Sequence, residues 1–278
     1  MYVRPPTLAS ALDHLRTDEL TVVAGGTDFY PGRAGRAVAE AILDIGGIAE
    51  LRGITEHADH WRIGATTTWT DLVDAPLPPL FDALVQAARD VGGVQIQNAG
   101  TLAGNLCNAS PAADGVPPLL ALDATVELRS LDTVSRVPLA DFILGPRSTR
   151  LGPDQLVTAI LVARPRHRAT SRFAKLGARR YLVISIVSVA ACLEVDADGR
   201  IARAGVAVGA CSPVARRLPA LEAALAGLDP RCGLGDVVTA AHVAGLAPLD
   251  DVRATRGYRL DAARTLVARV LDELGACA

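Results

Sequence analysis

The sequence predicts an α+β protein built in two consecutive parts. In the first part, short β-branched runs alternate with amphipathic stretches, and Gly or Pro residues separate them. In the second part, apolar runs at 173–175, 183–195 and 201–208 predict three strands of an antiparallel sheet. From residue 218 onward, apolar residues recur at helical spacing. Strands and helices segregated in this way are typical of the α+β class.

The first part opens with a small unit of one helix and two strands. Ser10 is a candidate N-cap for a helix that carries Leu12 and Leu15 on one side. Strands are expected at 20–23 and 41–45, and a glycine-rich turn follows the first of them. We expect this unit to form a first subdomain of about residues 1–50.

A second subdomain is expected over about residues 51–165. Its segments read as short strands joined by polar turns, with helices between them, one of which is ended by Gly92-Gly93. The expected strands are 50–54, 61–65, 124–128 and 156–162, and the expected helical segments begin near Thr66 and cover 80–91 and 117–122.

The Pro- and Arg-rich stretch 164–168 predicts the boundary between the two parts, so we expect domains of 1–165 and 166–278. In the second domain, Asp196-Ala197-Asp198-Gly199 is a hairpin signal between two strands. The expected helices are 218–228, 234–244 and 257–275.

Composition argues against several classes of function. The formal net charge is −2, so no basic field would attract nucleic acid or an anionic membrane. No apolar run reaches the roughly 20 residues that cross a bilayer. The cysteines form no C-x-x-C pair and no metal-ligand spacing, which predicts a chain without zinc or an iron–sulfur cluster. Their odd number and wide spacing suit reduced thiols, so we expect a cytoplasmic protein. The five are Cys107, Cys192, Cys211, Cys232 and Cys277.

The first candidate binding site is Val22-Val23-Ala24-Gly25-Gly26-Thr27-Asp28. A strand that runs into Gly-Gly can present backbone N–H groups closely to a phosphate. Thr27 adds a hydroxyl and Asp28 a carboxylate, although Asp28 could equally cap the next turn. By itself this motif is a weak signal, because Gly pairs end many strands for geometric reasons.

The second candidate is residues 95–114, a polar stretch without Lys or Glu. A solvated loop usually carries such residues, so we expect a loop whose polar groups face a ligand. The two loops together would form a cleft of N–H donors for a pyrophosphate, with Asp114 accepting from a ribose hydroxyl or a flavin-ring N–H. G-x-G-x-x-G and a Walker lysine are absent after Val23, so the site is of another type. The alternative is two buried turns in a core of small residues.

Short motifs in a fixed order carry a resemblance over nearly the whole chain. Together they resemble the flavin-binding (medium) subunit of the molybdenum hydroxylases, the family of xanthine and carbon monoxide dehydrogenases. The motifs are Ala24-Gly25-Gly26-Thr27-Asp28, Thr101-Leu102-Ala103-Gly104-Asn105, Ala109-Ser110-Pro111-Ala112-Ala113-Asp114, Lys175-Leu176-Gly177-Ala178-Arg179-Arg180 and a C-terminal signature from Asp250 to Arg259.

The resemblance implies a fold, a cofactor and partners. The fold is a two-subdomain FAD-binding unit of the vanillyl-alcohol-oxidase (PCMH) type, followed by a three-stranded antiparallel sheet with a helical bundle. The cofactor is non-covalent FAD. Molybdopterin and 2Fe–2S clusters are expected on a large and a small partner subunit, in a dimer of heterotrimers. No catalytic residue or metal ligand is expected in this chain. The implied FAD-binding residues are Val22, Val23, Ala24, Gly25, Gly26, Thr27, Asp28, Phe29, Thr101, Leu102, Ala103, Gly104, Asn105, Asp114, Val157 and Lys175.

Three positions depart from the family pattern. Ala103 stands where relatives usually carry Gly, and its methyl group would reshape the turn slightly. Gln97 replaces an Arg and removes a cation. Tyr181 follows the Arg pair where relatives often carry an acidic residue, and whether it contacts the flavin stays open.

Single residues have alternative interpretations. Lys175 would steady the reduced flavin or the pyrophosphate, or else be a solvated lysine at a strand edge. Asp114 has no cationic neighbour in sequence and is the stronger candidate. Cys107 is expected to be a packing residue, and Trp61 and Trp69 to lie in the core or at an interface rather than on the flavin.

The expected function is electron transfer through FAD. A partner iron–sulfur subunit would supply electrons, and the external acceptor would be NAD, a quinone, a cytochrome or oxygen. The organic substrate would bind to a partner, so this sequence does not identify it. Two alternatives remain: a stand-alone flavin oxidoreductase with its own substrate, and a flavin-free assembly module.

Overall fold

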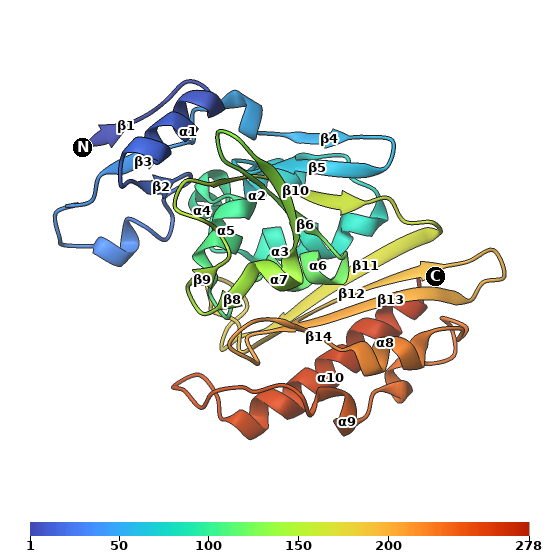
Figure 1. Cartoon of the computed structure of the whole chain (residues 1–278). Helices are drawn as coiled ribbons and strands as arrows, with labels where there is room; N and C mark the ends of the chain where they lie inside the picture. The colour runs from blue at the N-terminus through green and yellow to red at the C-terminus, as the bar shows by residue number, and fades with distance from the viewer. Residues whose placement is uncertain (278) are drawn as a thin grey trace.

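A computed structural model describes residues 1–277 and shows three main sheets with helices packed between and around them (Figure 1). The N-terminal unit is a parallel sheet in the order β1-β3-β2, on which helix α1 (Leu8–Thr17) packs through Leu8, Leu12 and Leu15. Thr7, not Ser10, caps this helix, because the Thr7 hydroxyl accepts the Ser10 amide. The strands are β1 (Tyr2–Val3), β2 (Thr21–Val23) and β3 (Ile42–Asp44).

The second sheet is antiparallel, with five strands in the order β4-β5-β10-β6-β7. Its central strand β10 is buried along seven of its eight residues, which explains why Thr158 is the one polar residue in its sequence. The predicted strand 50–54 is wrong: its first half forms a 3₁₀ turn, and the strand starts at Ile54. The strands are β4 (Ile54–Glu56), β5 (His60–Gly64), β6 (Thr125–Arg129), β7 (Val134–Pro138) and β10 (Leu156–Ala163).

Short helices fill the space beside this sheet. Thr68 begins α2 through a capping box with Asp71, as the Thr-rich stretch predicts. The helices are α2 (Trp69–Asp74), α3 (Asp82–Asp90), α4 (Val94–Ala99), α5 (Leu102–Asn108), α6 (Val116–Ala121) and α7 (Leu139–Phe142). Between α7 and β10 lies a small hairpin of β8 (Ile143–Gly145) and β9 (Ser148–Thr149), and 3₁₀ turns are η1 (Pro31–Arg33), η2 (Ala49–Leu51) and η3 (Pro79–Phe81).

The predicted loop at 95–114 is largely helical. Thr101 caps α5 by accepting the Gly104 amide, and Leu102 and Leu106 are fully buried. The pattern hid this helix because Gly, Asn and Cys have poor helix propensity and the apolar stripe consists of only two leucines. Tertiary packing therefore makes this segment helical.

The C-terminal sheet has three long antiparallel strands, as expected, and a short fourth one, in the order β11-β12-β13-β14. Strand β11 starts earlier than predicted, whereas β12 starts at Val187 rather than at residue 183. Residues 183–186 precede the strand because ladder pairing with β11 begins only at Val187, opposite Leu176. The strands are β11 (Arg168–Leu176), β12 (Val187–Val195), β13 (Ile201–Gly209) and β14 (Arg216–Arg217).

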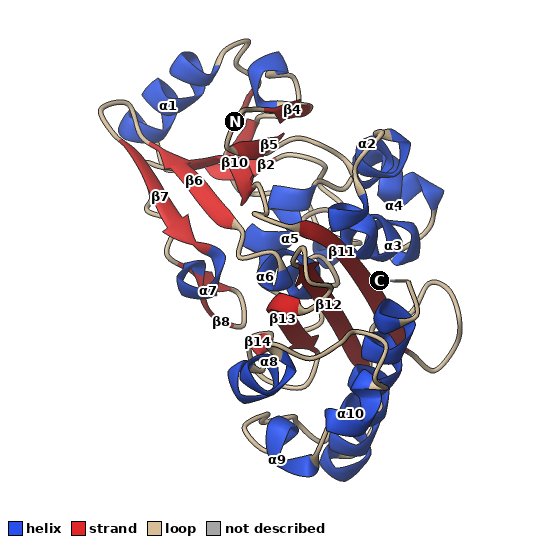
Figure 2. Ribbon diagram, turned by 90° about the vertical axis from the view of Figure 1, so that its right-hand side faces the viewer, coloured by secondary structure: helices blue, strands red, loops and turns tan. Residues whose placement is uncertain are grey.

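Helices cover both faces of this sheet (Figure 2). Ala190 and Cys192 of β12 pack towards α3 and α6 of the first part, while Val189 and Leu193 pack towards the long α10. The predicted helix 234–244 is split, because Thr239 starts a new helix. The C-terminal helical elements are α8 (Pro219–Leu225), η4 (Leu234–Val237), α9 (Ala240–Val243) and α10 (Arg256–Gly275). No helix within residues 1–277 is long and apolar enough to span a membrane.

Candidate functional site

The glycine turn, residues 24–28, follows β2 and lies against the end of α4 (Figure 1). A Cβ atom on Gly25 would lie 1.8 Å from the carbonyl oxygen of Ala99, so only glycine allows this approach. Gly26 has a φ of +67°. Within residues 1–277, the amides of Gly25, Gly26 and Thr27 have no acceptor in the chain. The turn therefore presents free N–H donors beside the second motif.

The second motif is the start of α5 rather than a loop. Thr101 is the N-cap, and the Leu102 amide donates to the carbonyl oxygen of Thr67 over 3.1 Å. Leu102 and Ala103 turn their side chains into the core, with 0% and 4% exposure, so neither side chain lines a cavity. The Ala103 methyl needs no special backbone angles, because the residue is helical. Ala103 thus has the ordinary backbone angles that its methyl group was expected to demand.

The two motifs line one cavity of about 890 Å³, called here the main cavity. All eight residues from Val22 to Phe29 line this cavity, together with Thr101, Gly104, Asn105 and Asp114. The Asn105 side-chain oxygen accepts the Gly115 amide at 3.3 Å, which leaves its NH₂ group for other contacts. Val157 does not line the main cavity: it is 4% exposed and packs in the core from β10.

Asp114 and Lys175 form a buried ion pair at the wall of the main cavity. Lys175 Nζ lies 2.9 Å from Asp114 Oδ2, and their side chains are 5% and 9% exposed. Ser185 Oγ donates to Asp114 Oδ1 at 2.6 Å. Burial raises the pKa of Asp114, while the nearby ammonium and the hydroxyl act in the opposite direction. Both carboxylate oxygens are thus bound within the chain, and the cationic partner is 61 residues away rather than a neighbour in sequence.

Lys175 is the only lysine among 28 lysine and arginine residues. It is not a solvated lysine, since its ammonium also donates to the Asp90 carbonyl oxygen at 2.9 Å. It lines a second cavity of about 480 Å³, with Arg179, Arg180 and Tyr181 at its edge. Tyr181 lies beneath the Arg180 guanidinium and does not line the main cavity.

Several residues of the main cavity were not predicted. Arg33 and Arg147 are the cations among its described lining residues. Arg33 stacks on the Phe29 ring at 3.8 Å, and Arg147 holds a φ of +60°. Proximity in sequence to the glycine turn could have indicated Arg33, whereas nothing local indicates Arg147. Other lining residues that sequence reasoning missed are Leu182, Val183 and Ile184, and also Gly32, Asp90, Val91 and Gly92.

Two residues expected to be structural lie at the cavity wall. Trp69 is 2% exposed and sits between Gly100 and Gly115, so it is a core residue that also lines the main cavity. Cys107 lines it as well, and burial raises the pKa of its thiol to about 12. A thiol with that pKa is protonated at neutral pH and is a poor nucleophile.

The cavity fits a dinucleotide such as FAD. Its volume lies near the upper end of the range of roughly 300–1,000 Å³ for small-molecule sites. The free amides of the glycine turn and the Thr27 hydroxyl suit a pyrophosphate, which needs several donors at once. The apolar side chains of Leu182 and Ile184 suit a flat ring system. Donors and apolar groups thus occur in one continuous cavity.

Comparisons with known proteins agree on one family. Residues 1–165 match the FAD binding domain in molybdopterin dehydrogenase, and residues 172–274 match the CO dehydrogenase flavoprotein C-terminal domain. A putative xanthine dehydrogenase FAD-binding subunit of Escherichia coli is 31% identical over 100% of this chain and 96% of its own length. The nicotine 6-hydroxylase medium subunit of Paenarthrobacter nicotinovorans is 29% identical over 99% of this chain and 97% of its own.

The solved structure of carbon monoxide dehydrogenase from Hydrogenophaga pseudoflava gives the same result. One of its chains superposes with a TM-score of 0.86 at 26% identity, covering 98% of this chain and 95% of that one. Sequence and structure are therefore similar over the full length, and this chain belongs to the family of FAD-binding subunits of the molybdenum hydroxylases.

Proposed function

We propose that the main cavity holds FAD non-covalently, with the pyrophosphate between the glycine turn and the start of α5. As a member of its family, the chain is the FAD subunit of a molybdenum-containing hydroxylase or dehydrogenase. The observation that carries the proposed site is the contact of Gly25 with Ala99, which brings two motifs distant in sequence to one cavity. Bound FAD supplies electron transfer in one- or two-electron steps.

Each part of the cavity has a separate role in this proposal. The amides of Gly25, Gly26 and Thr27 bind the phosphates, and Asn105 donates its NH₂ group to the cofactor. Leu102 and Ala103 contribute only through the backbone of α5. Asp114, fixed by Lys175 and Ser185, orients the polar edge of the ring, so Lys175 acts through Asp114. Arg147 adds positive charge at the cavity wall, whereas the charge of Arg33 is paired with Glu40.

The arrangement of the chain and its partners is also part of the proposal. The fold would be of the PCMH type, with a domain boundary near residue 165, which the Arg164-Pro165 sequence supports. The partners would be a molybdopterin large subunit and a 2Fe–2S small subunit in a dimer of heterotrimers; a relative named a medium subunit supports such partners. Five unpaired cysteines support a cytoplasmic location. The acceptor would be NAD, a quinone, a cytochrome or oxygen.

The site is tested by an isosteric charge change. Asn105→Asp keeps the acceptor for the Gly115 amide but places a carboxylate in the cavity, so we expect FAD affinity to fall about 100-fold, the size of an uncompensated charge contact. Asn98→Asp is the matched control, because Asn98 accepts from Thr70 at the surface outside the main cavity. Fluorescence titration of FAD measures both. Equal affinities for the two variants would contradict the proposed site.

The electron-transfer role is tested with the co-purified complex. The visible flavin spectrum should bleach with the organic substrate only when the partner subunits are present. Bleaching of the chain alone would instead indicate a stand-alone oxidoreductase, and a complex without flavin an assembly module.

A further inference from the structure

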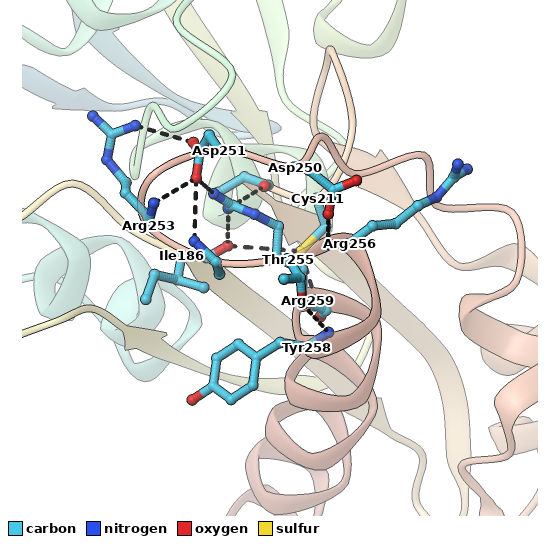
Figure 3. A network of polar contacts seen from close by, with 11 residues as sticks. Ile186, Cys211, Asp250, Asp251, Arg253, Thr255, Arg256, Tyr258 and Arg259 are labelled. Atoms are coloured by element: carbon cyan, nitrogen blue, oxygen red, sulfur yellow. Dashed lines mark hydrogen bonds and ion pairs between the residues drawn. The ribbon is translucent and has the colours of Figure 1, made fainter.

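Arg259 is a buried arginine outside the main cavity, in the first turns of α10 (Figure 3). Its side chain is 5% exposed. One terminal nitrogen donates to the carbonyl oxygens of Ile186 at 2.6 Å and Ala210 at 3.1 Å, and the other lies 2.7 Å from Asp251 Oδ1. A buried guanidinium is expensive to desolvate, and an apolar side chain would often pack there at lower cost. The positions of its hydrogen-bond partners are therefore informative.

Ile186 connects Arg259 to the carboxylate at the cavity. The preceding residue, Ser185, donates to Asp114 Oδ1. The Ile186 amide donates to Leu176 O at 2.7 Å, and Leu176 follows the Lys175 that binds Asp114 Oδ2. Lys175 and Ser185 hold Asp114, and the residues that follow them, Leu176 and Ile186, are hydrogen-bonded to each other. Arg259 holds the carbonyl group of the same residue, Ile186, and so the peptide that follows it.

The segment before Ile186 needs such an anchor. Residues 182–184 line the main cavity, yet they lie outside any strand, and Leu182 and Ile184 are each more than half exposed. Leu182 has a φ of +52°, a strained conformation for a branched residue. Its carbonyl oxygen accepts from the Arg179 side chain, which is itself exposed. The first fully buried point of this segment is the Ser185-Ile186 pair.

From this geometry we infer that Arg259 is a positioning residue of the flavin site: through the Ile186 carbonyl it sets the place of Ser185, and hence of Asp114 and the 182–184 segment. The inference rests on the proposed function, because it requires the flavin in the main cavity. Arg259 itself does not line that cavity.

The test uses the full chain in its complex, with Arg259→Lys as the variant. Lysine keeps the charge beside Asp251 but cannot bond Ile186 and Asp251 in the same planar geometry. We expect FAD affinity to fall about tenfold and the spectrum of the bound flavin to shift. Arg253→Gln is the control, since Arg253 pairs with the same Asp251 and does not reach Ile186.

A second background separates positioning from general stability. In Ser185→Ala, where the link to Asp114 is cut, Arg259→Lys should change FAD affinity and the flavin spectrum less than in the protein that keeps Ser185, because only the 182–184 segment still connects Arg259 to the cavity; it should still lower Tm. The inference is overturned if, in the protein that keeps Ser185, Arg259→Lys lowers Tm but leaves FAD affinity and the flavin spectrum unchanged, or if its effect on the flavin is equally large in both backgrounds. A wild-type complex without FAD would overturn the proposed function, and this inference with it, whereas the other two outcomes leave the proposed function standing.

Discussion

Asp114 and Asp251 each pair with a buried cation, but their surroundings shift their pKa values in opposite directions. The Asp251 side chain is 34% exposed and accepts the amides of Arg253 and Ala254, which together with Arg259 lower its pKa to about 2. The Asp114 side chain is 9% exposed, and burial raises its pKa despite Lys175 and Ser185. The comparison teaches that hydration and the number of donors, rather than the ion pair alone, decide whether a carboxylate stabilises the fold.

The largest difference in the free energy of unfolding is expected between Asp114→Asn and Asp251→Asn. In the wild-type protein both carboxylate oxygens of Asp114 accept hydrogen bonds, one from Lys175 and one from Ser185. In Asp114→Asn the new NH₂ group must therefore face one of these two donors, and the lysine stays charged and buried. We expect a loss of about 3–5 kcal/mol in the free energy of unfolding, the size found for broken buried pairs. Urea unfolding of the FAD-free chain measures it, which keeps ligand binding out of the comparison.

The matched variant is Asp251→Asn. Asp251 Oδ1 alone accepts from Arg259 and the two amides, so an asparagine oxygen keeps these bonds. Its expected loss is about 1 kcal/mol, as for a half-exposed pair. If Asp114→Asn and Asp251→Asn lose equal stability, the burial of the Asp114 pair does not make it contribute more to the free energy of unfolding than the Asp251 pair.

An intermediate effect is expected in the pH dependence of stability. The folded pKa of Asp251 is lowered from 3.8 to about 2, so its contribution is fully present above about pH 4 and is lost as the pH falls towards 2. A raised pKa has the opposite sign, so Asp114 favours the folded state more as it becomes protonated. We expect the Tm difference between wild type and Asp251→Asn to shrink to zero between pH 4 and 2. A difference that grows on acidification would show that the lowered pKa is not present.

The smallest effect is expected for Arg253→Gln. Arg253 is 38% exposed and contacts Asp251 Oδ2, the oxygen that Arg259 does not use. Exposed pairs contribute about 0–1 kcal/mol, so we expect a change below about 0.5 kcal/mol in urea unfolding. A loss comparable to that of Asp114→Asn would mean that the segment around Asp251 depends on this exposed contact for its stability.

Local patterns allowed a good part of the fold to be predicted. The glycine turn, the long strands β10 and β13 and the hairpin at 196–199 depend on neighbouring residues, so their sequence signals are strong. Helix α5 was missed because its stability comes from burying Leu102 and Leu106 against distant segments. The start of β12 was misplaced because Val183, Ile184 and Ile186 extend the strand-like sequence pattern, whereas pairing with β11 begins only at Val187.

The candidate site was predictable only where a motif is local. Asp114 is 61 residues from Lys175 and 71 from Ser185, and no spacing rule links such positions. Resemblance to the family supplied Asp114 and Lys175 but not their mutual contact, and it gave no indication of Ser185 or Arg147. Leu102, Ala103 and Val157 were included because motifs are read as whole stretches, whereas side chains of one stretch point to different sides.

The single lysine gives this protein an unusual chemical signature. All the remaining residues among the 28 lysines and arginines are arginines, and amine reagents do not acylate arginine. Since Lys175 is buried and holds Asp114, an acylating reagent or a lysine-specific protease can act on a side-chain amine only after the wall of the cavity has opened. Modification at that one position therefore reports how often the Lys175–Asp114 contact at the wall of the main cavity opens.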